Sequence, residues 1–217
     1  ELEAYGYLID NADFKRASTD TWGMRFSGSV RPSLLTYSYT AEIAHQRSAG
    51  GNPADYRARY SRIKGGLSYR RLSLSLANER LGSDNNAGFI TPLATLHRYQ
   101  GWADKFVALT PNAGLVETHL TLAGRFPGFR YRLQYHNFST DKGSTAIGNE
   151  LGVDVQWRIH QKYLVELKFA DYKASKNAAK VTGVGRSDLL NALNEGTKSR
   201  TLSTDALSSL WSTVGGV

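Results

Sequence analysis

The sequence predicts an all-β chain that forms an antiparallel, up-and-down transmembrane β-barrel. Nearly every readable segment alternates apolar and polar residues with a period of two, which is the period of a strand and not of a helix. No run of about eighteen uncharged apolar residues offers a membrane helix. The mean hydropathy of −0.41 fits strands that are apolar on one face only. The connections between segments also alternate between short and long.

The N-terminal half of the chain contains five such segments. Every second residue supplies the apolar face, as in Trp22, Met24 and Phe26, in Leu35, Tyr37, Tyr39 and Ile43, and in Leu72, Leu74 and Leu76. The residues between them are mostly polar or charged. We therefore expect strands at 2–10, 21–31, 33–46, 56–69 and 71–81.

The C-terminal half repeats the pattern, most clearly in the segment 129–138. There the odd-numbered residues Phe129, Tyr131, Leu133 and Tyr135 share one face, and arginine, glutamine and histidine occupy the other. Comparable alternation predicts the remaining strands at 115–126, 129–138, 149–159 and 162–173, with a weaker tenth near 207–217.

Short connections fall at 31–32, 70–71, 127–128 and 160–161, and longer ones at 11–20, 47–55, 82–114, 139–148 and 174–206. Short periplasmic turns and long extracellular loops are typical of outer-membrane barrels. Both chain ends lie in the periplasm only if the strand number is even, which requires the tenth strand. We expect 1–217 to form a single barrel domain, with 174–206 as a long outer loop that contains one short helix.

The charge balance favours acidic partners. Lys plus Arg is 27 against 19 for Asp plus Glu, a net charge of +8 in 217 residues. The absence of cysteine excludes a disulfide framework, a thiolate zinc site and a cysteine nucleophile. The basic residues recur on the polar face of nearly every strand instead of gathering in one patch, so we expect no nucleic-acid partner.

If the polar face lines a channel, its basic side chains give a modest preference for anions. Arg130 and Arg132 are the first candidates, because they lie two residues apart on one strand with no acid between them. The other pore-lining candidates are Arg25, Arg62, Lys64, Arg70, Arg158 and Lys168. For any single arginine, a cross-strand ion pair that only stiffens the wall is an equal alternative.

The connection 82–114 is too apolar for a loop that lies only in solvent. Its side chains Leu93, Leu96, Tyr99, Trp102 and Phe106 need burial, so we expect it to fold into the barrel as a constriction. The candidates for gating residues in it are Trp102, Asp104 and Lys105. At its start, 84–86 lacks the spacing of a calcium loop, and an Asx-rich turn is the expected structure.

The chain resembles the alginate-export outer-membrane porins and their relatives over residues 78–174. The resemblance rests on the runs 79–84 (ERLGSD), 89–97 (FITPLATLH), 101–106 (GWADKF) and 110–115 (TPNAGL), with support from 135–138, 148–151 and 168–174. It implies a barrel in the bacterial outer membrane that passes small or polymeric solutes, alginate among them, with the long loop helping to gate it.

Members of that family are about twice this length, and their last strand usually ends in an aromatic residue, whereas this chain ends at Val217. The resemblance therefore implies the C-terminal half of a barrel of sixteen to eighteen strands. The alternative is that ten strands close alone into a narrow barrel whose interior is filled by side chains.

The expected function is an outer-membrane channel for anionic or polar solutes, in contact with membrane lipid and lipopolysaccharide. The five histidines, His45, His97, His119, His136 and His160, show no metal-pair or Ser/His spacing, so we expect no catalytic residue, no metal and no cofactor. An outer-membrane barrel enzyme and a soluble ligand-binding β-barrel are the alternatives.

Overall fold

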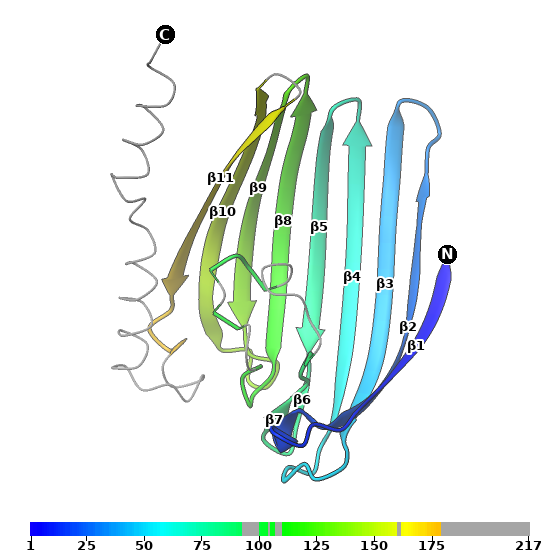
Figure 1. Ribbon diagram of the computed structural model, residues 1–217, viewed down its shortest axis with the longest axis vertical. Coiled ribbons are helices and arrows are strands. Elements are labelled where there is room, and N and C mark those ends of the chain that lie inside the picture. Colours follow the sequence, from blue (N-terminus) through cyan, green and yellow to red (C-terminus); the bar gives the residue numbers. More distant parts are fainter. Residues whose placement is uncertain (93–99, 104, 107–109, 160–161, 179–217) are drawn as a thin grey trace. The chain divides into compact units, whose positions relative to one another are not determined.

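The computed structural model describes residues 1–92, 100–103, 105–106, 110–159 and 162–178. The chain divides into two units, 1–182 and 183–217, and all described residues belong to the first. They form one nine-stranded antiparallel sheet in the order β1-β2-β3-β4-β5-β8-β9-β10-β11, and a small hairpin, β6-β7, lies between β5 and β8 in the chain (Figure 1). Each strand of the large sheet pairs with the next, which is the up-and-down arrangement.

The strand positions agree with those that the alternation predicts. The bounds are β1 Leu2–Ile9, β2 Thr19–Val30, β3 Leu35–Ser48, β4 Arg57–Tyr69, β5 Leu72–Leu81, β6 Ser83–Asp84, β7 Ala87–Gly88, β8 Leu115–Phe126, β9 Phe129–Ser139, β10 Ala146–Ile159 and β11 Tyr163–Ala174, with a 3-10 turn η1 at Lys15–Ala17. The largest difference is β10, which begins three residues before the expected start because a register irregularity between Ala146 and Gly148 lets pairing with β9 continue. The expected tenth strand at 207–217 and the helix within 174–206 lie outside the described residues.

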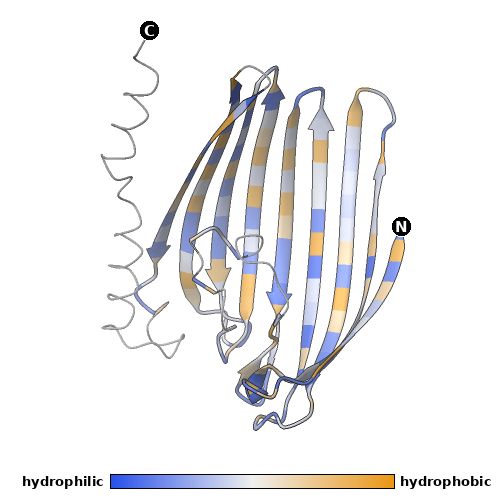
Figure 2. Cartoon of the chain, viewed as in Figure 1, coloured by the Kyte–Doolittle hydropathy of each residue, from blue (hydrophilic) through white to orange (hydrophobic). Residues whose placement is uncertain are grey.

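The sheet exposes its apolar face and buries much of its polar face. In β8, Leu120 and Leu122 are 45% and 37% exposed, whereas Glu117, on the other face, is 1% exposed. Figure 2 shows the same alternation of hydrophilic and hydrophobic residues along most strands. A soluble sheet buries its apolar face, so this inverted arrangement is the one that a lipid-facing barrel wall requires.

Exposed aromatic side chains gather on the apolar face beside the short turns. They are Tyr37, Tyr69, Phe126, Phe129, Trp157 and Tyr163, each at or near the end of a strand that enters such a turn. Aromatic rings of this kind form the girdle at a membrane interface. The short turns therefore mark one edge of the apolar band.

The long connections lie at the opposite end of the strands (Figure 1). One of them contains the β6-β7 hairpin, in which Asn85 and Asn86 take φ values of 46° and 58°. Two left-handed residues in a row are typical of a tight hairpin turn, which confirms the expected Asx-rich turn. No described segment is a helix long and apolar enough to cross a membrane.

A charge on the exposed apolar face tests whether that face meets hydrocarbon. Leu76 lies within β5 and is 55% exposed. We expect Leu76→Arg to lower the free energy of unfolding in lipid vesicles by about 2–4 kcal/mol, because the guanidinium would be buried in lipid. The matched control Ser75→Arg puts the same charge on the polar face and should leave the denaturant midpoint nearly unchanged. Equal losses in the two variants would contradict the assignment of the faces.

Candidate functional site

The connection between β7 and β8 is attached to the polar face of the sheet at Gln46. This amide is 1% exposed, and its Oε1 accepts hydrogen bonds from the Ile90 N–H at 2.9 Å and from the Tyr56 hydroxyl at 3.0 Å. Its Nε2 donates to the Ile90 carbonyl at 2.8 Å and to Thr21 Oγ1 at 3.0 Å. Burial raises the pKa of Tyr56 to about 12, so its hydroxyl keeps the proton that it donates. All four hydrogen-bonding positions of the Gln46 amide are used, and the start of the connection is held firmly.

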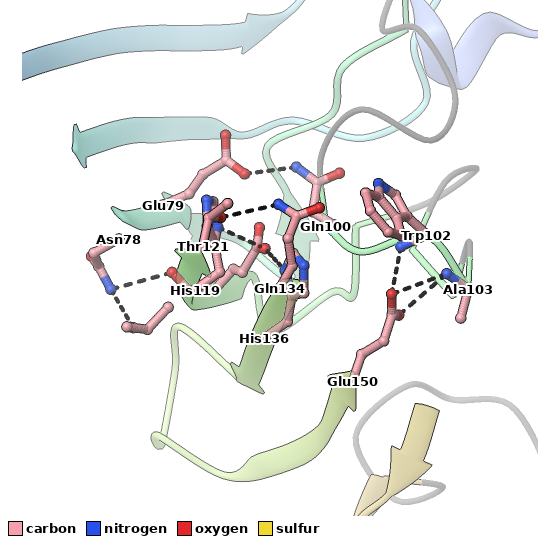
Figure 3. A network of polar contacts seen from close by, with 12 residues as sticks. Asn78, Glu79, Gln100, Trp102, Ala103, His119, Thr121, Gln134, His136 and Glu150 are labelled. Carbon is pink, nitrogen blue, oxygen red and sulfur yellow. Dashed lines mark hydrogen bonds and ion pairs between the residues drawn. The ribbon is translucent and has the colours of Figure 1, made fainter. Parts of the chain in front are cut away.

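The middle of the connection is held by two glutamates of the sheet (Figure 3). Glu79 of β5 accepts a hydrogen bond from Gln100 Nε2 at 2.9 Å. Glu150 of β10 accepts from the Trp102 backbone N–H at 2.5 Å and from the Ala103 N–H at 3.2 Å. Gly101, between Gln100 and Trp102 in the chain, has a φ of +85°. A side chain there would collide with the Glu150 carboxylate. These bonds hold residues 100–103 against the polar face.

Two rings of the connection also pack on this face. Phe106 is buried against Phe138, with ring centroids 4.9 Å apart, and against Tyr172 at 6.3 Å. The Trp102 ring packs over the backbone of Gly152, where any side chain would crowd it, and lies 5.3 Å from the Arg132 guanidinium. The described part of the connection therefore packs on β9, β10 and β11.

Of the three gating candidates, Trp102 and Lys105 fall among the described residues. Trp102 lies on the polar face, as described above, and the Lys105 ammonium lies 6.0 Å from the Tyr172 ring. Asp104 is outside the described residues. Whether this segment opens and closes a channel stays a prediction.

A buried cluster of one glutamate and two histidines lies beside the loop anchors. His119 of β8 and His136 of β9 are direct cross-strand partners, and Glu117 lies two residues before His119 on the same face. Glu117 Oε1 is 3.1 Å from His119 Nδ1 and 2.5 Å from His136 Nδ1. Spacing along the chain does not link His136 to the other two residues; the register of the β8-β9 hairpin does.

The predicted basic candidates Arg25 and Arg62 lie in a cross-strand row of alternating charge. Arg25 faces Glu42, Glu42 faces Arg62, and Arg62 faces Glu79 in the register of β2 to β5. This row fits the interpretation of charges that stiffen the wall. Lys64 lies one step nearer the short turns, between Thr40 and Ala77 of the neighbouring strands.

Arg132 has an acidic partner on the neighbouring strand. Its Nη2 lies 2.9 Å from Asp154 Oδ2, and Asp154 is its cross-strand neighbour in β10. Arg132 therefore makes the kind of cross-strand ion pair that is the equal alternative for any single arginine of this face. Lys168 of β11 is the other cross-strand neighbour of Asp154, and its ammonium lies 3.2 Å from Glu166. Arg158 lies near the end of β10, next to the short turn.

The remaining candidates belong to an arginine cluster at the short-turn end. A cavity of about 470 Å³ is lined by Arg70, Arg71, Arg125, Arg130 and Arg132, and Asp154 is the one acidic side chain among its described lining residues. Arg70 is in the β4-β5 turn, with a φ of 52°, and not on a strand. Arg125 is the cross-strand neighbour of Arg130, and its N–H donates to the Arg71 carbonyl.

Sequence reasoning missed Arg71 and Arg125 as members of this cluster. Arg71 is the first residue of one predicted strand and Arg125 the next-to-last residue of another, where a position on the polar face is hard to assign. The available clue was the predicted turn at 127–128, which places 125 opposite 130.

The fold is that of solved outer-membrane proteins. OccAB4 of Acinetobacter baumannii matches with a TM-score of 0.59 at 9% identity, over 73% of this chain and 42% of that chain. The outer membrane protein OpdK of Pseudomonas aeruginosa matches with a TM-score of 0.56 at 17% identity, over 72% and 45%. A structure of OpdK with vanillate matches with a TM-score of 0.52 at 12% identity, over 74% and 46%. No protein-family model and no curated protein matches the sequence.

The chain has the fold of part of a porin-type outer-membrane β-barrel. It spans less than half the length of these structures. The bacterial outer membrane is where this fold resides. Because the identities are low, the likeness shows the architecture alone. It does not indicate which solute this chain would pass.

Removing the Glu150 carboxylate should release the middle of the connection. In Glu150→Ala we expect hydrogen exchange at the Trp102 and Ala103 amides to become faster by about tenfold or more, because each loses a charged acceptor. Hydrogen-exchange mass spectrometry of the protein in detergent measures this. Glu166→Ala, which removes an acid of β11 that bonds to Gln156 and not to the connection, is the control. Unchanged exchange in Glu150→Ala would show that the carboxylate does not hold the connection.

Proposed function

We propose that this chain forms part of the wall of an outer-membrane channel that passes anionic solutes, and in particular carboxylates, by diffusion. The observation that carries the proposal is the arginine cluster around the cavity at the short-turn end. In this assignment the polar face lines the lumen, the apolar face meets membrane lipid, and lipopolysaccharide surrounds the loop end. The protein acts without a cofactor and without chemistry.

The cluster is strongly electropositive because its charges are poorly balanced. Five arginines and one aspartate line the cavity. Guanidinium groups stay charged at any physiological pH and bind carboxylates through two parallel hydrogen bonds. Charged rings at a channel wall raise the local concentration of the opposite ion. Anions are therefore favoured at the end of the strands that we assign to the periplasm.

The loop end carries the opposite charge. Glu79, Glu117 and Glu150 lie there, each at most 3% exposed, and the anchored residues 100–103 cover this part of the face. A solute that crosses would meet arginines at one end and a passage narrowed by the connection at the other. The connection, and not the arginine cluster, would then set the upper limit on solute size.

Two carboxylated probes distinguish the solute classes. Vanillate, which is present in one OpdK structure, is a small aromatic carboxylate, and an alginate oligomer is a polymeric uronate. Both offer carboxylates to the arginines, but only the small solute passes a narrow constriction easily. We propose small carboxylates as the principal cargo and retain alginate as the polymeric candidate that the sequence resemblance suggests.

Neutralising the arginine cluster should reduce anion selectivity. For Arg125→Ser/Arg130→Ser we expect the reversal potential under a salt gradient in a planar bilayer to shift towards cation selectivity, because two fixed positive charges leave the lumen. The control Arg57→Ser/Arg59→Ser removes the same number of charges from the apolar face of the sheet, where both side chains of β4 are exposed. An equal shift in the two variants, or none in the first, would contradict a role of the cluster in selectivity.

Deleting the constriction should enlarge the channel. Replacing 92–106 by a short glycine-serine linker leaves the Gln46 contacts with Ile90 in place but removes Trp102 and Phe106 from the polar face. We expect higher single-channel conductance and weaker block by alginate oligomers. Heat-modifiable migration in detergent gels verifies that the variant is folded. An unchanged or lower conductance in a folded variant would contradict the constriction.

A further inference from the structure

Glu117, His119 and His136 bring three metal-ligating side chains together. One ligand atom from each lies within 4.8 Å of the other two. The rings of His119 and His136 face each other across β8 and β9, with centroids 5.1 Å apart, and His136 is also stacked on Phe138 at 5.9 Å. The strands therefore fix the ligands in place before any ion binds.

Three buried glutamates lie at or beside the cluster, and Arg62 faces one of them, Glu79. Glu79 is the cross-strand neighbour of Glu117, and Glu150 is the cross-strand neighbour of His136. Three carboxyl groups thus surround the two imidazoles. Buried charges of one sign are costly, and a divalent cation at the cluster would offset them.

Two atoms of the cluster have unused hydrogen-bonding capacity. Glu117 Oε2 and His136 Nε2 have no hydrogen-bond partner among the described residues, although their side chains are only 1% and 5% exposed. Buried polar atoms usually have a hydrogen-bond partner, and a bound ion would explain why these two atoms have none among the described residues. The hydrogen bonds from the two histidines to Glu117 Oε1 leave these positions open.

We propose that Glu117, His119 and His136 form a binding site for Zn²⁺ or a similar first-row transition metal. Two imidazole nitrogens and one carboxylate oxygen are a donor set that zinc accepts, and the site has no thiolate that would direct it to Cu⁺. Mg²⁺ and Ca²⁺ prefer oxygen ligands only and fit poorly. Neighbouring ligands of tetrahedral zinc are about 3.3 Å apart, so small side-chain rotations would complete the site.

This site does not depend on the proposed channel. Three protein ligands would leave a fourth position of a tetrahedral zinc ion for water. The competing explanation is a hydrogen-bonded cluster that only stiffens the hairpin. The two explanations differ in metal affinity and in spectroscopic signature, not in stability alone.

Isothermal titration calorimetry of the full protein in detergent, stripped with a chelator, tests the proposal with ZnCl₂ in the presence of excess Mg²⁺. We expect one Zn²⁺ per chain in the wild type. His119→Gln should weaken this binding at least tenfold, and His119→Gln/His136→Gln should abolish it. The control His45→Gln changes an exposed histidine on the opposite face of β3 and should bind as the wild type does. No binding by the wild type, or equal binding by the double variant, would overturn the proposal.

Copper spectroscopy provides a readout that survives a partial loss of stability. The electron paramagnetic resonance spectrum of Cu²⁺ bound to the wild type should show hyperfine coupling to two imidazole nitrogens, and that of His119→Gln to one. Migration in detergent gels confirms that each variant is folded. Identical spectra for the wild type and His119→Gln would assign the copper to other histidines and reject the site.

Discussion

A strand inside a membrane must satisfy every backbone N–H and C=O within the protein, because the hydrocarbon offers no partner. The nine-stranded sheet meets this requirement with long antiparallel ladders, such as the twelve-residue register between β10 and β11. The period of two follows directly, since each paired residue sends its side chain to lipid or to the opposite face. The remaining features of the molecule depend on how that second face is filled.

The polar face is filled partly by its own charges and partly by a segment of the chain that returns to it. The segment is held by hydrogen bonds to the Gln46 amide, by hydrogen bonds to the carboxyl groups of Glu79 and Glu150, and by the packing of Phe106 on Phe138. Nearer the short turns, arginines are the main charged side chains that line the cavity of the polar face. Arginines thus gather near the short turns, and buried glutamates lie nearer the long connections, where Arg62 faces one of them.

Much of the fold could be predicted from the sequence, because local alternation decides both the strands and their faces. The register of the β8-β9 hairpin could also have been predicted from the position of its turn. A turn at 127–128 places residue 119 opposite 136, so the His119 and His136 pair was accessible. The pairing of Arg132 with Asp154 depends on the register between β9 and β10 across a longer connection, which a single sequence does not specify. The contacts of Gln46 with Ile90 span 44 residues and leave no local pattern.

The Gln46 amide binds the Ile90 backbone through both its oxygen and its nitrogen, much as a neighbouring strand would. These bonds are neutral, so neither ionic strength nor pH near neutrality alters them. The hydrogen bonds from Trp102 and Ala103 end on the carboxyl group of Glu150, and their strength depends on its ionisation. The two attachments therefore differ in kind: the hydrogen bonds of Gln46 do not depend on ionisation, and those of Glu150 do.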